Sequence, residues 1–380
     1  MACKDWGYQT PAARYIRSPL TVQSVMSPVK SIFACLALLF ITSAALAATV
    51  TNPPPLIRMA VLGDSDSHSY QDEHTFGSSR ARGAEYRRGT FQWTEILAKS
   101  GQIDFGTWGL WGTMGRIAQL RDFFKLSSRA PRKQDFENNF AASGARCEHL
   151  MEGRLRQTPR LLEIMDRSPR DWLTGVVVVR IGANNFGDAR SLGKLAMNSR
   201  DAGVMQEIQR CIAMIGESMA MIHAKHSSVR FVLVGIFNNA EIAAYSDKWT
   251  GPNELNNIGT GLDIFDHGLK TLAEKNPAAV FWDDRAWFRQ YWGSRYPQYQ
   301  GAPRTYKAPS GFEITNSIGD HPGNLSLTDG HAGLVANALW ARNLQQLLNQ
   351  MLGTHLRVIS DSEIRGLYDN ALRIGRQNKP

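Results

Sequence analysis

Continuous hydrophobic runs recur along the chain after residue 56, and each ends at a glycine or at paired polar residues. The runs are IRMAVLG (Ile57–Gly63), VVVVRIG (Val176–Gly182), VRFVLVG (Val229–Gly235) and AAVFW (Ala278–Trp282). Uninterrupted runs rich in β-branched residues are typical of strands that are buried on both faces of a sheet. The pattern therefore predicts four buried strands.

Between these runs, apolar residues recur at helical spacing. The predicted helices cover Thr90–Gly101, Gly203–His226, Ile258–Lys275 and Gly333–Leu352, and a broken helical pattern over Cys147–Asp166 restarts at Pro159. Two shorter strands are predicted, one in Ile103–Gly112 before a Gly/Trp loop and one in Phe136–Cys147 with a turn at Gly144. Strands that alternate with helices favour a parallel sheet covered on both faces. The predicted class is therefore α/β with three layers, in one domain over residues 48–353.

The first 47 residues have the pattern of a secretory signal peptide. Lys30 precedes an apolar run that ends in Ala45-Leu46-Ala47, with small residues where a signal peptidase cleaves. The run is shorter than a membrane span needs. The segment before Lys30 is long and irregular for a signal, so we expect Met26 to be the initiator and the residues before it to be a non-native extension. We expect export to the periplasm or medium of a bacterium, without stable membrane insertion after cleavage.

The chain is mildly basic, and this charge does not alter the predicted fold class. Removal of residues 1–47, which carry four basic and one acidic residue, lowers the formal net charge from +9 to +6. Basic residues concentrate only in Ser79–Arg88 and in the segment 354–380, which we expect to be a basic tail. Since no nucleic-acid motif accompanies them, we expect a solvated surface and no nucleic-acid partner, with an anionic polysaccharide or envelope surface as the alternative.

Two of the four cysteines, Cys147 and Cys211, lie in the predicted domain. An exported protein meets an oxidising compartment, where this pair can form a disulfide. Two separate buried thiols are the alternative. The pair lacks C-x-x-C spacing, so it does not indicate a zinc site.

Polar residues follow three of the predicted strands at the edge where parallel sheets bind ligands. These are Gly63-Asp64-Ser65, Gly182-Ala183-Asn184 and Asn238-Asn239. A serine hydroxyl becomes a useful nucleophile only when a base takes its proton and donors stabilise the oxyanion. Ser65 is the candidate nucleophile of this edge.

The remaining parts of such a site are also present downstream. His331, before the last predicted helix, is a candidate base with Asp329 as its acid, and Gly144 and Asn184 are candidate oxyanion donors. Each has a simpler interpretation. Ser65 and Gly144 can simply be turn residues. Asn184 and Asp329 can be helix caps. His331 can be an ordinary surface histidine.

With these residues in place, the chain resembles the SGNH superfamily of serine hydrolases, also called the GDSL esterase/lipase family. Its first block matches Gly63-Asp64-Ser65, its second-block glycine matches Gly144, its third-block Gly-x-Asn matches Gly182 and Asn184, and its fifth-block histidine matches His331. The blocks occur in family order. The resemblance implies a flavodoxin-like parallel sheet (the SGNH hydrolase fold), catalysis by Ser65, His331 and Asp329, and an oxyanion hole from Ser65, Gly144 and Asn184.

The resemblance further implies a serine esterase of the carboxylesterase or acetylesterase type that works through an acyl-enzyme and needs no cofactor. Short acyl esters, acetyl groups on carbohydrate above all, are the expected substrates, and no substrate-binding residue is identified. Two alternatives stay open: an acyltransferase that uses a sugar acceptor, and a non-catalytic carbohydrate-binding member of the fold.

Three positions depart from the family pattern. Asp66 follows the Gly-Asp-Ser instead of leucine, and Asn185 replaces the aspartate that usually ends the third block. The family acid usually stands three residues before the histidine, where this chain has Thr328. Asp329 stands two residues before, and the nearby Asp320-His321 pair competes for the same role. We prefer His331, because Gly333 and an amphipathic helix follow it.

Two segments suggest further roles. Asp64, Asp66, His68, Asp72 and His74 are all possible metal ligands, but their spacing matches neither a calcium loop nor a zinc motif. We expect no metal there and instead expect these groups to hold the Ser65 loop. The segment Phe281–Gln300 is rich in Trp, Tyr and Arg. It either offers aromatic faces to a sugar or forms a satellite core, and the same choice applies to Trp108–Gly112.

Overall fold

The structure is a computed structural model that describes residues 56–77, 82–124, 128–296 and 304–378. The predicted signal peptide over residues 1–47, with the expected start at Met26, lies outside the described residues. Within the described ranges, no helix is both long enough and apolar enough to cross a membrane.

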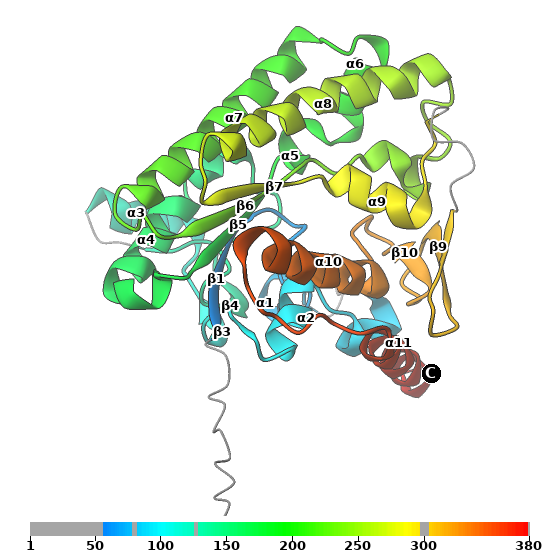
Figure 1. The fold of residues 1–380 in the computed structure, drawn as a ribbon, viewed down its shortest axis with the longest axis horizontal. Coiled ribbons are helices and arrows are strands. Elements are labelled where there is room, and N and C mark those ends of the chain that lie inside the picture. The colour runs from blue at the N-terminus through cyan, green and yellow to red at the C-terminus, as the bar shows by residue number, and fades with distance from the viewer. Residues whose placement is uncertain (1–55, 78–81, 125–127, 297–303, 379–380) are drawn as a thin grey trace, which may run out of the picture. The chain divides into compact units, whose positions relative to one another are not determined.

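A five-stranded parallel sheet forms the centre of the fold (Figure 1). Its strands, in spatial order, are β2 (Ile103–Asp104), β1 (Ile57–Gly63), β5 (Val176–Arg180), β6 (Arg230–Val234) and β7 (Ala279–Trp282). Counted along the chain among themselves, they follow the flavodoxin-like order 2-1-3-4-5. The order reverses between β1 and β5, which is where such sheets bind their ligands. The predicted α/β class with a parallel sheet is confirmed.

Side chains of the central strands alternate between two hydrophobic cores. Ala60 and Leu62 of β1 point into one core, and Met59 and Val61 point into the other. The same alternation runs through β5 and β6, because successive side chains of a strand point to opposite faces. Both faces of the sheet are therefore buried, which explains why these strands are uninterrupted apolar runs.

Helices cover each face and complete three layers (Figure 1). The main helices of the first core are α4 (Gln157–Arg167), α5 (Ala183–Phe186), α6 (Ala189–Met197), α7 (Ala202–His223) and α8 (Pro252–Glu274), and the 3-10 turns η2 (Cys147–Leu150) and η3 (Pro169–Trp172) also contribute to it. Those of the second core are α2 (Trp93–Lys99), α9 (Asp284–Trp292), α10 (Leu334–Leu352) and α11 (Asp361–Gln377).

Smaller elements surround the sheet. An antiparallel pair joins β3 (Trp108–Trp111) to β4 (Lys133–Phe136), and β8 (Thr305–Lys307), β9 (Glu313–Ile318) and β10 (Asn324–Ser326) form a second small sheet. The remaining short helices are α1 (Glu73–Phe76), η1 (Ala84–Gly89), α3 (Gly115–Phe123), η4 (Asn239–Glu241) and η5 (Ala243–Tyr245).

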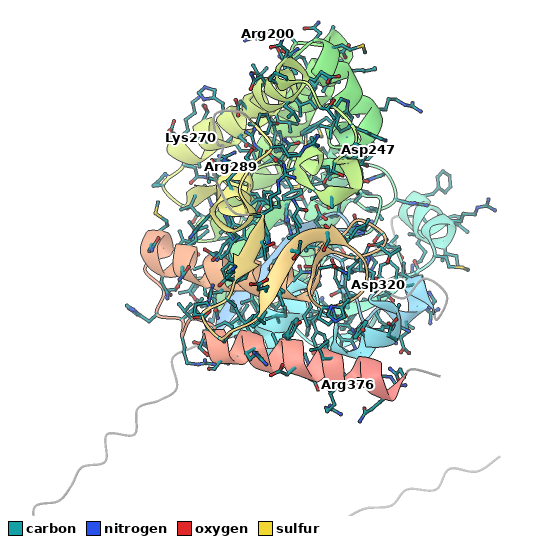
Figure 2. All side chains as sticks on the ribbon, turned by 90° about the vertical axis from the view of Figure 1, so that its right-hand side faces the viewer. Arg200, Asp247, Lys270, Arg289, Asp320 and Arg376 are labelled. Carbon is teal, nitrogen blue, oxygen red and sulfur yellow. A yellow bond between two sulfur atoms is a disulfide. The ribbon has the colours of Figure 1, made fainter. Side chains whose placement is uncertain are left out.

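The C-terminal segment differs from the expected basic tail over 354–380. Helix α11 buries Ile364 and Ala371 against the second core. Gly375 approaches the Tyr86 ring of η1 so closely that a side chain there would clash with it. The basic residues lie on the outer side of this amphipathic helix, as Arg376 shows in Figure 2. The apolar positions were hidden among many arginines, and the folded unit extends beyond residue 353.

A disulfide joins Cys147 in η2 to Cys211 in α7. Both residues are buried in the first core. Of the two possibilities for this pair, the structure has the bonded one.

Candidate active site

Ser65 lies in a tight turn directly after β1. Gly63 ends the strand where a Cβ would lie 2.5 Å from the carbonyl oxygen of Arg180, so only glycine fits without a shift. Asp64 then closes the turn, because its side chain accepts the N–H of Asp66 at 3.0 Å and its carbonyl accepts the N–H of Ser67 at 3.2 Å. Ser65 is half-buried, and its Oγ makes no hydrogen bond within the described part of the chain.

Three side chains from distant elements hold the loop that follows Ser65. Asn139 donates to the carbonyl of Ser67 at 2.8 Å. Trp93 Nε1 and Arg180 Nη1 donate to the carbonyl of Asp66 at 3.1 and 3.0 Å. The loop is therefore fixed by the segment after β4, by α2 and by β5 together, as a site for precise chemistry requires.

The Asp64 side chain is buried within this turn. Burial, with Asp66 as a charged neighbour, raises the pKa of Asp64 to about 7. The N–H groups of Asp66 and Gly182 and the charge of Arg180 act in the opposite direction and lower this pKa. In this structure the Asp64 side chain stabilises the turn by accepting a hydrogen bond from the N–H of Asp66.

The structure brings Gly144 and Asn184 to the edge of the sheet where Ser65 lies. The segment 139–142 runs beside β1, with Phe140 N–H donating to Val61 and Ala142 N–H donating to Gly63. The predicted short strand in Phe136–Cys147 is therefore an irregular extension of the sheet. It delivers Gly144, whose φ of +76° suits glycine, into an exposed turn.

Asn184 follows β5 at the first turn of α5. Its Nδ2 donates to the carbonyl of Ala145 at 2.9 Å, so the amide lies against the Gly144 turn. The neighbouring Asn185 points the other way, where its Oδ1 accepts the N–H of Cys147 at 2.9 Å. Asn185, which stands where the family usually has aspartate, therefore binds the turn that carries the disulfide.

The structure also brings Asp329 to His331. Asp329 Oδ2 lies 2.9 Å from Nδ1 of His331, off the direction of a well-aligned hydrogen bond, and Oδ1 accepts the backbone N–H of His331 at 3.1 Å. Such contacts are often poorly aligned without substrate. Burial alone would raise the pKa of Asp329, but the His331 and Arg82 side chains outweigh it and hold that pKa well below its usual range.

The competing pair is engaged elsewhere. Asp320, on the connection between β9 and β10 (Figure 2), accepts the hydroxyl of Thr328 at 2.7 Å and its N–H at 3.4 Å. His321 Nδ1 accepts the N–H of Gly323 at 3.0 Å. Of these two candidate acids, Asp329 lies at contact distance from His331, whereas Asp320 contacts Thr328.

Arg82 connects the two halves of the candidate site. Its Nη2 lies 3.1 Å from Nε2 of His331, its Nε donates to Asp329 at 2.9 Å, and its Nη1 lies 3.4 Å from the carbonyl oxygen of Ser65. The guanidinium is only 4% exposed and lies 4.7 and 4.6 Å from the rings of Tyr70 and Phe76. Ser65 and His331 therefore contact one and the same cation.

Sequence reasoning missed Arg82. Its only signal was the basic cluster Ser79–Arg88, which we interpreted as solvated surface. Nothing local distinguishes the buried arginine from the exposed Arg88, because its ring partners and its acid lie elsewhere in the chain.

The polar run after Ser65 is used for hydrogen bonds. His68 Nε2 lies 2.8 Å from Asp72, and His68 Nδ1 lies 3.0 Å from the hydroxyl of Ser143. Across the described ranges, no group of three or more His, Cys, Asp or Glu side chains is placed to hold a metal ion. These contacts support the expected role in holding the loop for His68 and Asp72, whereas His74 is exposed and its side chain makes no such contact within the described ranges.

A small cavity adjoins the site, and a larger cavity adjoins the small one. A cavity of about 50 Å³ is lined by Asp66 from the Ser65 loop and by Gly330 and Ala332 on either side of His331. It also reaches Phe237 and Phe288, which line a second cavity of about 510 Å³.

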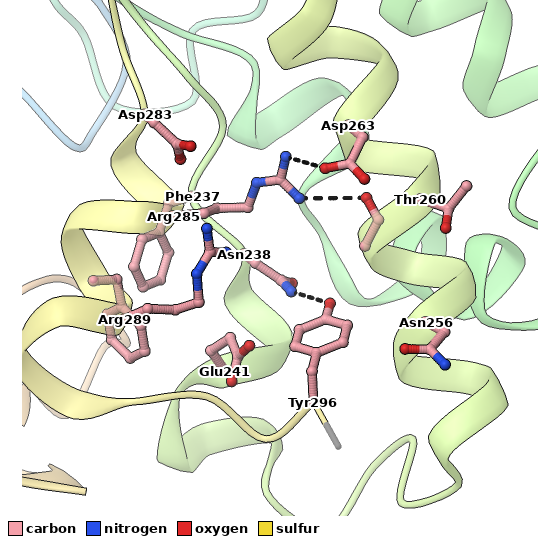
Figure 3. Close-up of a pocket in the computed structure, with 12 residues that line it drawn as sticks. Phe237, Asn238, Glu241, Asn256, Thr260, Asp263, Asp283, Arg285, Arg289 and Tyr296 are labelled. Atoms are coloured by element: carbon pink, nitrogen blue, oxygen red, sulfur yellow. Dashed lines mark hydrogen bonds and ion pairs between the residues drawn. The ribbon is translucent and has the colours of Figure 1, made fainter. Parts of the chain in front are cut away.

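The larger cavity lies between α8 and α9 and is mostly polar (Figure 3). Arg285 donates to Asp263 at 2.7 Å, and Asn238 donates to the hydroxyl of Tyr296 at 2.5 Å. Its other polar lining residues include Glu241, Asn256, Thr260, Asp283 and Arg289.

The aromatic segment Phe281–Gln300 is mainly core where the structure describes it. Trp287, Tyr291 and Trp292 of α9 are buried in the second core, with Tyr296 buried at the cavity wall. Of the two interpretations, the satellite core applies to these residues. Trp108 in β3 is different, since it is 40% exposed.

No protein-family model matches the chain, and no curated protein sequence matches it. Among solved structures, the chain is similar to an extracellular lipase from Streptomyces rimosus, with 16% identity, 65% of this chain and 86% of that chain covered, and a TM-score of 0.35. It is also similar to phospholipase A1 from Streptomyces albidoflavus NA297, with 13% identity, 78% and 100% covered, and a TM-score of 0.37. At such identities and scores, neither likeness bears on the chemistry of this chain.

Proposed function

We propose that this protein is a serine esterase that hydrolyses carboxylic esters through an acyl-enzyme. One observation carries the proposal: Ser65, Gly144 and Asn184 share the edge where the strand order reverses, and His331 with Asp329 is joined to Ser65 through Arg82. This set supplies a nucleophile, a base with its acid, and oxyanion donors, as resemblance to the SGNH superfamily implies.

In the proposed reaction, Ser65 Oγ attacks the ester carbonyl while His331 Nε2 takes the hydroxyl proton. The N–H groups of Ser65 and Gly144 and the amide of Asn184 donate to the oxyanion. The C–O bond then breaks, and the alcohol leaves with the proton from His331. Water, deprotonated by the same nitrogen, attacks the acyl-enzyme and releases the carboxylic acid. Charged Asp329 favours the imidazolium that forms in each half.

Arg82 has to give up one contact for this to occur. The single lone pair of Nε2 faces Arg82 Nη2 at 3.1 Å, so it is not free for the Ser65 proton in this arrangement. The contact with Asp329 does not involve that nitrogen and can persist. This occupied base is also the observation that favours the second candidate, a non-catalytic binding protein.

The two cavities support a substrate with a small acyl group and a polar alcohol. The cavity beside His331, at about 50 Å³, has room for a few atoms and not for a long acyl chain. The cavity of about 510 Å³ has the size of a typical small-ligand pocket and presents amides, carboxylates and arginines suited to hydroxyl groups. Acetyl esters of carbohydrate in the bacterial envelope or medium fit both. Transfer to a sugar hydroxyl would use the same acyl-enzyme with another acceptor.

A fluorophosphonate probe followed by peptide mass spectrometry tests the proposal. The expected result is a single adduct on Ser65, lost when the protein is unfolded before labelling. A folded protein that is not labelled, and that turns over neither p-nitrophenyl acetate nor an acetylated oligosaccharide, would favour the binding protein.

The p-nitrophenyl esters of acetate, butyrate and decanoate test the preference for a short acyl chain. We expect kcat/KM to fall as the acyl chain becomes longer.

A further inference from the structure

A second serine–histidine–aspartate set lies beside the proposed nucleophile. The hydroxyl of Ser143 is 3.0 Å from His68 Nδ1, and His68 Nε2 is 2.8 Å from Asp72 Oδ2. Ser143 is exposed, whereas His68 and Asp72 are buried. His68 belongs to the Ser65 loop, and Ser143 directly precedes Gly144. The set therefore joins the loop of the nucleophile to the turn that carries an oxyanion donor.

The hydrogen bonds fix which nitrogen of His68 carries the proton. The backbone N–H of Ser143 also donates to Nδ1, at 3.1 Å, so Nδ1 must be the unprotonated acceptor. Nε2 then carries the hydrogen and donates to Asp72. Asp72 is itself held by the N–H groups of Thr75 and Gln134, each at 3.0 Å. Asp72 thus fixes the imidazole through Nε2, and the imidazole holds Ser143 through Nδ1.

Two observations argue against Ser143 as a second nucleophile. Burial and the nearby Lys133 lower the pKa of His68 to about 4, which makes it a poor acceptor for a serine proton. The N–H of Ser143, which a nucleophile commonly adds to its own oxyanion hole, is already engaged with Nδ1. The geometry instead suits a fixed, neutral hydrogen-bond acceptor.

The turn after Ser143 is held at both ends. His68 binds its first residue through two hydrogen bonds, and Asn184 binds the carbonyl of Ala145 at 2.9 Å. Between them, Gly144 has a φ of +76° and nothing within 4 Å of where its Cβ would be. Packing therefore does not hold Gly144, and the direction of its N–H depends on the two anchored neighbours.

We propose that His68, fixed by Asp72, is a positioning residue that holds the Ser143–Gly144 turn and so directs the Gly144 N–H toward the oxyanion. The inference rests on the proposed esterase function. Loss of one oxyanion donor costs on the order of 10² to 10³ in kcat. A donor that is misdirected and not removed should cost less, so loss of His68 should lower kcat roughly tenfold to a hundredfold.

Two replacements of His68 differ in where they place an acceptor. In His68→Asn the side-chain oxygen can occupy the place of Nδ1, and in His68→Gln it reaches only toward the place of Nε2. His68→Asn should keep most of the wild-type kcat on p-nitrophenyl acetate. His68→Ala and His68→Gln should show the full loss with KM changed by no more than about threefold, because the ground state does not need the oxyanion donor. His74→Ala, an exposed histidine of α1, is the matched control and should be unchanged.

Affinity for a boronic acid that forms a tetrahedral adduct on Ser65 gives a readout that loss of stability alone would not change. At a temperature where each variant is folded, this affinity should fall in parallel with kcat. Equal kcat for His68→Asn and His68→Gln, or a boronate affinity unchanged in both, would overturn the positioning role. If His68→Ala does not fold, these two variants still decide the question.

Labelling distinguishes this inference from the function on which it rests. If wild-type protein has no esterase activity and no Ser65 adduct, the proposed function itself fails. If wild-type protein is active but His68→Gln is equally active, only the positioning role fails. If Ser65→Ala still acquires a fluorophosphonate adduct on Ser143, that serine is a nucleophile and the positioning role is overturned.

Discussion

Asp329 Oδ2 lies 2.9 Å from His331 Nδ1, with only Gly330 between the two residues in the chain. Gly330 has a φ of +85°, which folds the chain back so that the aspartate also accepts the His331 N–H. An acid two residues before the histidine can therefore reach the imidazole. With this short spacing the carboxylate is poorly aligned with the Nδ1–H direction, and it is also 44% exposed.

Replacement of Asp329 tests this relationship. Asp329→Ala should lower kcat on p-nitrophenyl acetate by about a hundredfold, less than the roughly 10⁴-fold loss seen where a triad acid is buried and well aligned. Asp320→Ala should change kcat less than threefold, because Asp320 contacts Thr328 and not the imidazole. A larger loss for Asp320→Ala would show that the acid has been assigned to the wrong residue.

Arg82 should support the same acid. Arg82→Ala removes a charge-assisted hydrogen bond to Asp329, which is typically equivalent to about tenfold or more in rate. We expect kcat to fall about tenfold, with partial recovery in Arg82→Lys, in steady-state kinetics at neutral pH. A variant faster than the wild type would mean that the contact with His331 Nε2 is inhibitory and outweighs the support of Asp329.

The buried His68 predicts how stability depends on pH. Its pKa of about 4 in the folded protein is below its ordinary value of 6.5, so between these values the unfolded chain binds more protons than the folded one. The stability that comes from keeping His68 neutral is complete above pH 6.5 and is lost as pH falls toward 4. Asp72, Lys133 and Asp135 face the imidazole and contribute to its titration.

Urea unfolding of wild type and His68→Asn from pH 7 to pH 4 checks this dependence. The free energy of unfolding of the wild type should fall more steeply with decreasing pH, because the variant has no imidazole to protonate. Parallel curves over the whole range would show that His68 does not titrate differently in the two states.

The disulfide between Cys147 and Cys211 should contribute strongly to stability. It closes a loop with a sequence separation of 64 residues, for which loop entropy gives about 4 kcal/mol. Thermal unfolding of the protein should therefore shift to lower temperature with Cys147→Ser or with a reductant. The double variant Cys147→Ser, Cys211→Ser should add little to the single one. An unchanged Tm in all three cases would contradict a structural role for the bond.

The sheet could be predicted from sequence because its strands carry their own signal. Val176–Val179 and Phe231–Val234 are uninterrupted apolar runs, since both faces are buried, and the polar residues after them mark the carboxyl edge. The places of Ser65, Asn184 and His331 in the fold could be predicted for the same reason, as each follows or precedes a clear element, whereas the strand predicted before Gly144 is an irregular segment.

What sequence could not predict depends on contacts between distant residues. In the sequence Arg82 cannot be told from the exposed Arg88, because its contacts with Tyr70, Phe76 and Asp329 appear only in the fold. His68 could be placed in the Ser65 loop, but its partner Ser143 is 75 residues away. Helix α11 was hidden by its arginines, because the few apolar positions that it buries become significant only against η1 and α10.

The most direct test of the account is turnover of p-nitrophenyl acetate by the wild-type protein and by two serine variants of the same turn. Ser65→Ala should lower kcat by several orders of magnitude, because it removes the nucleophile. Ser67→Ala should retain most of the activity, since the Ser67 hydroxyl only accepts a hydrogen bond from Trp93, which also donates to the carbonyl of Asp66. Equal rates for Ser65→Ala and the wild type would contradict the esterase mechanism.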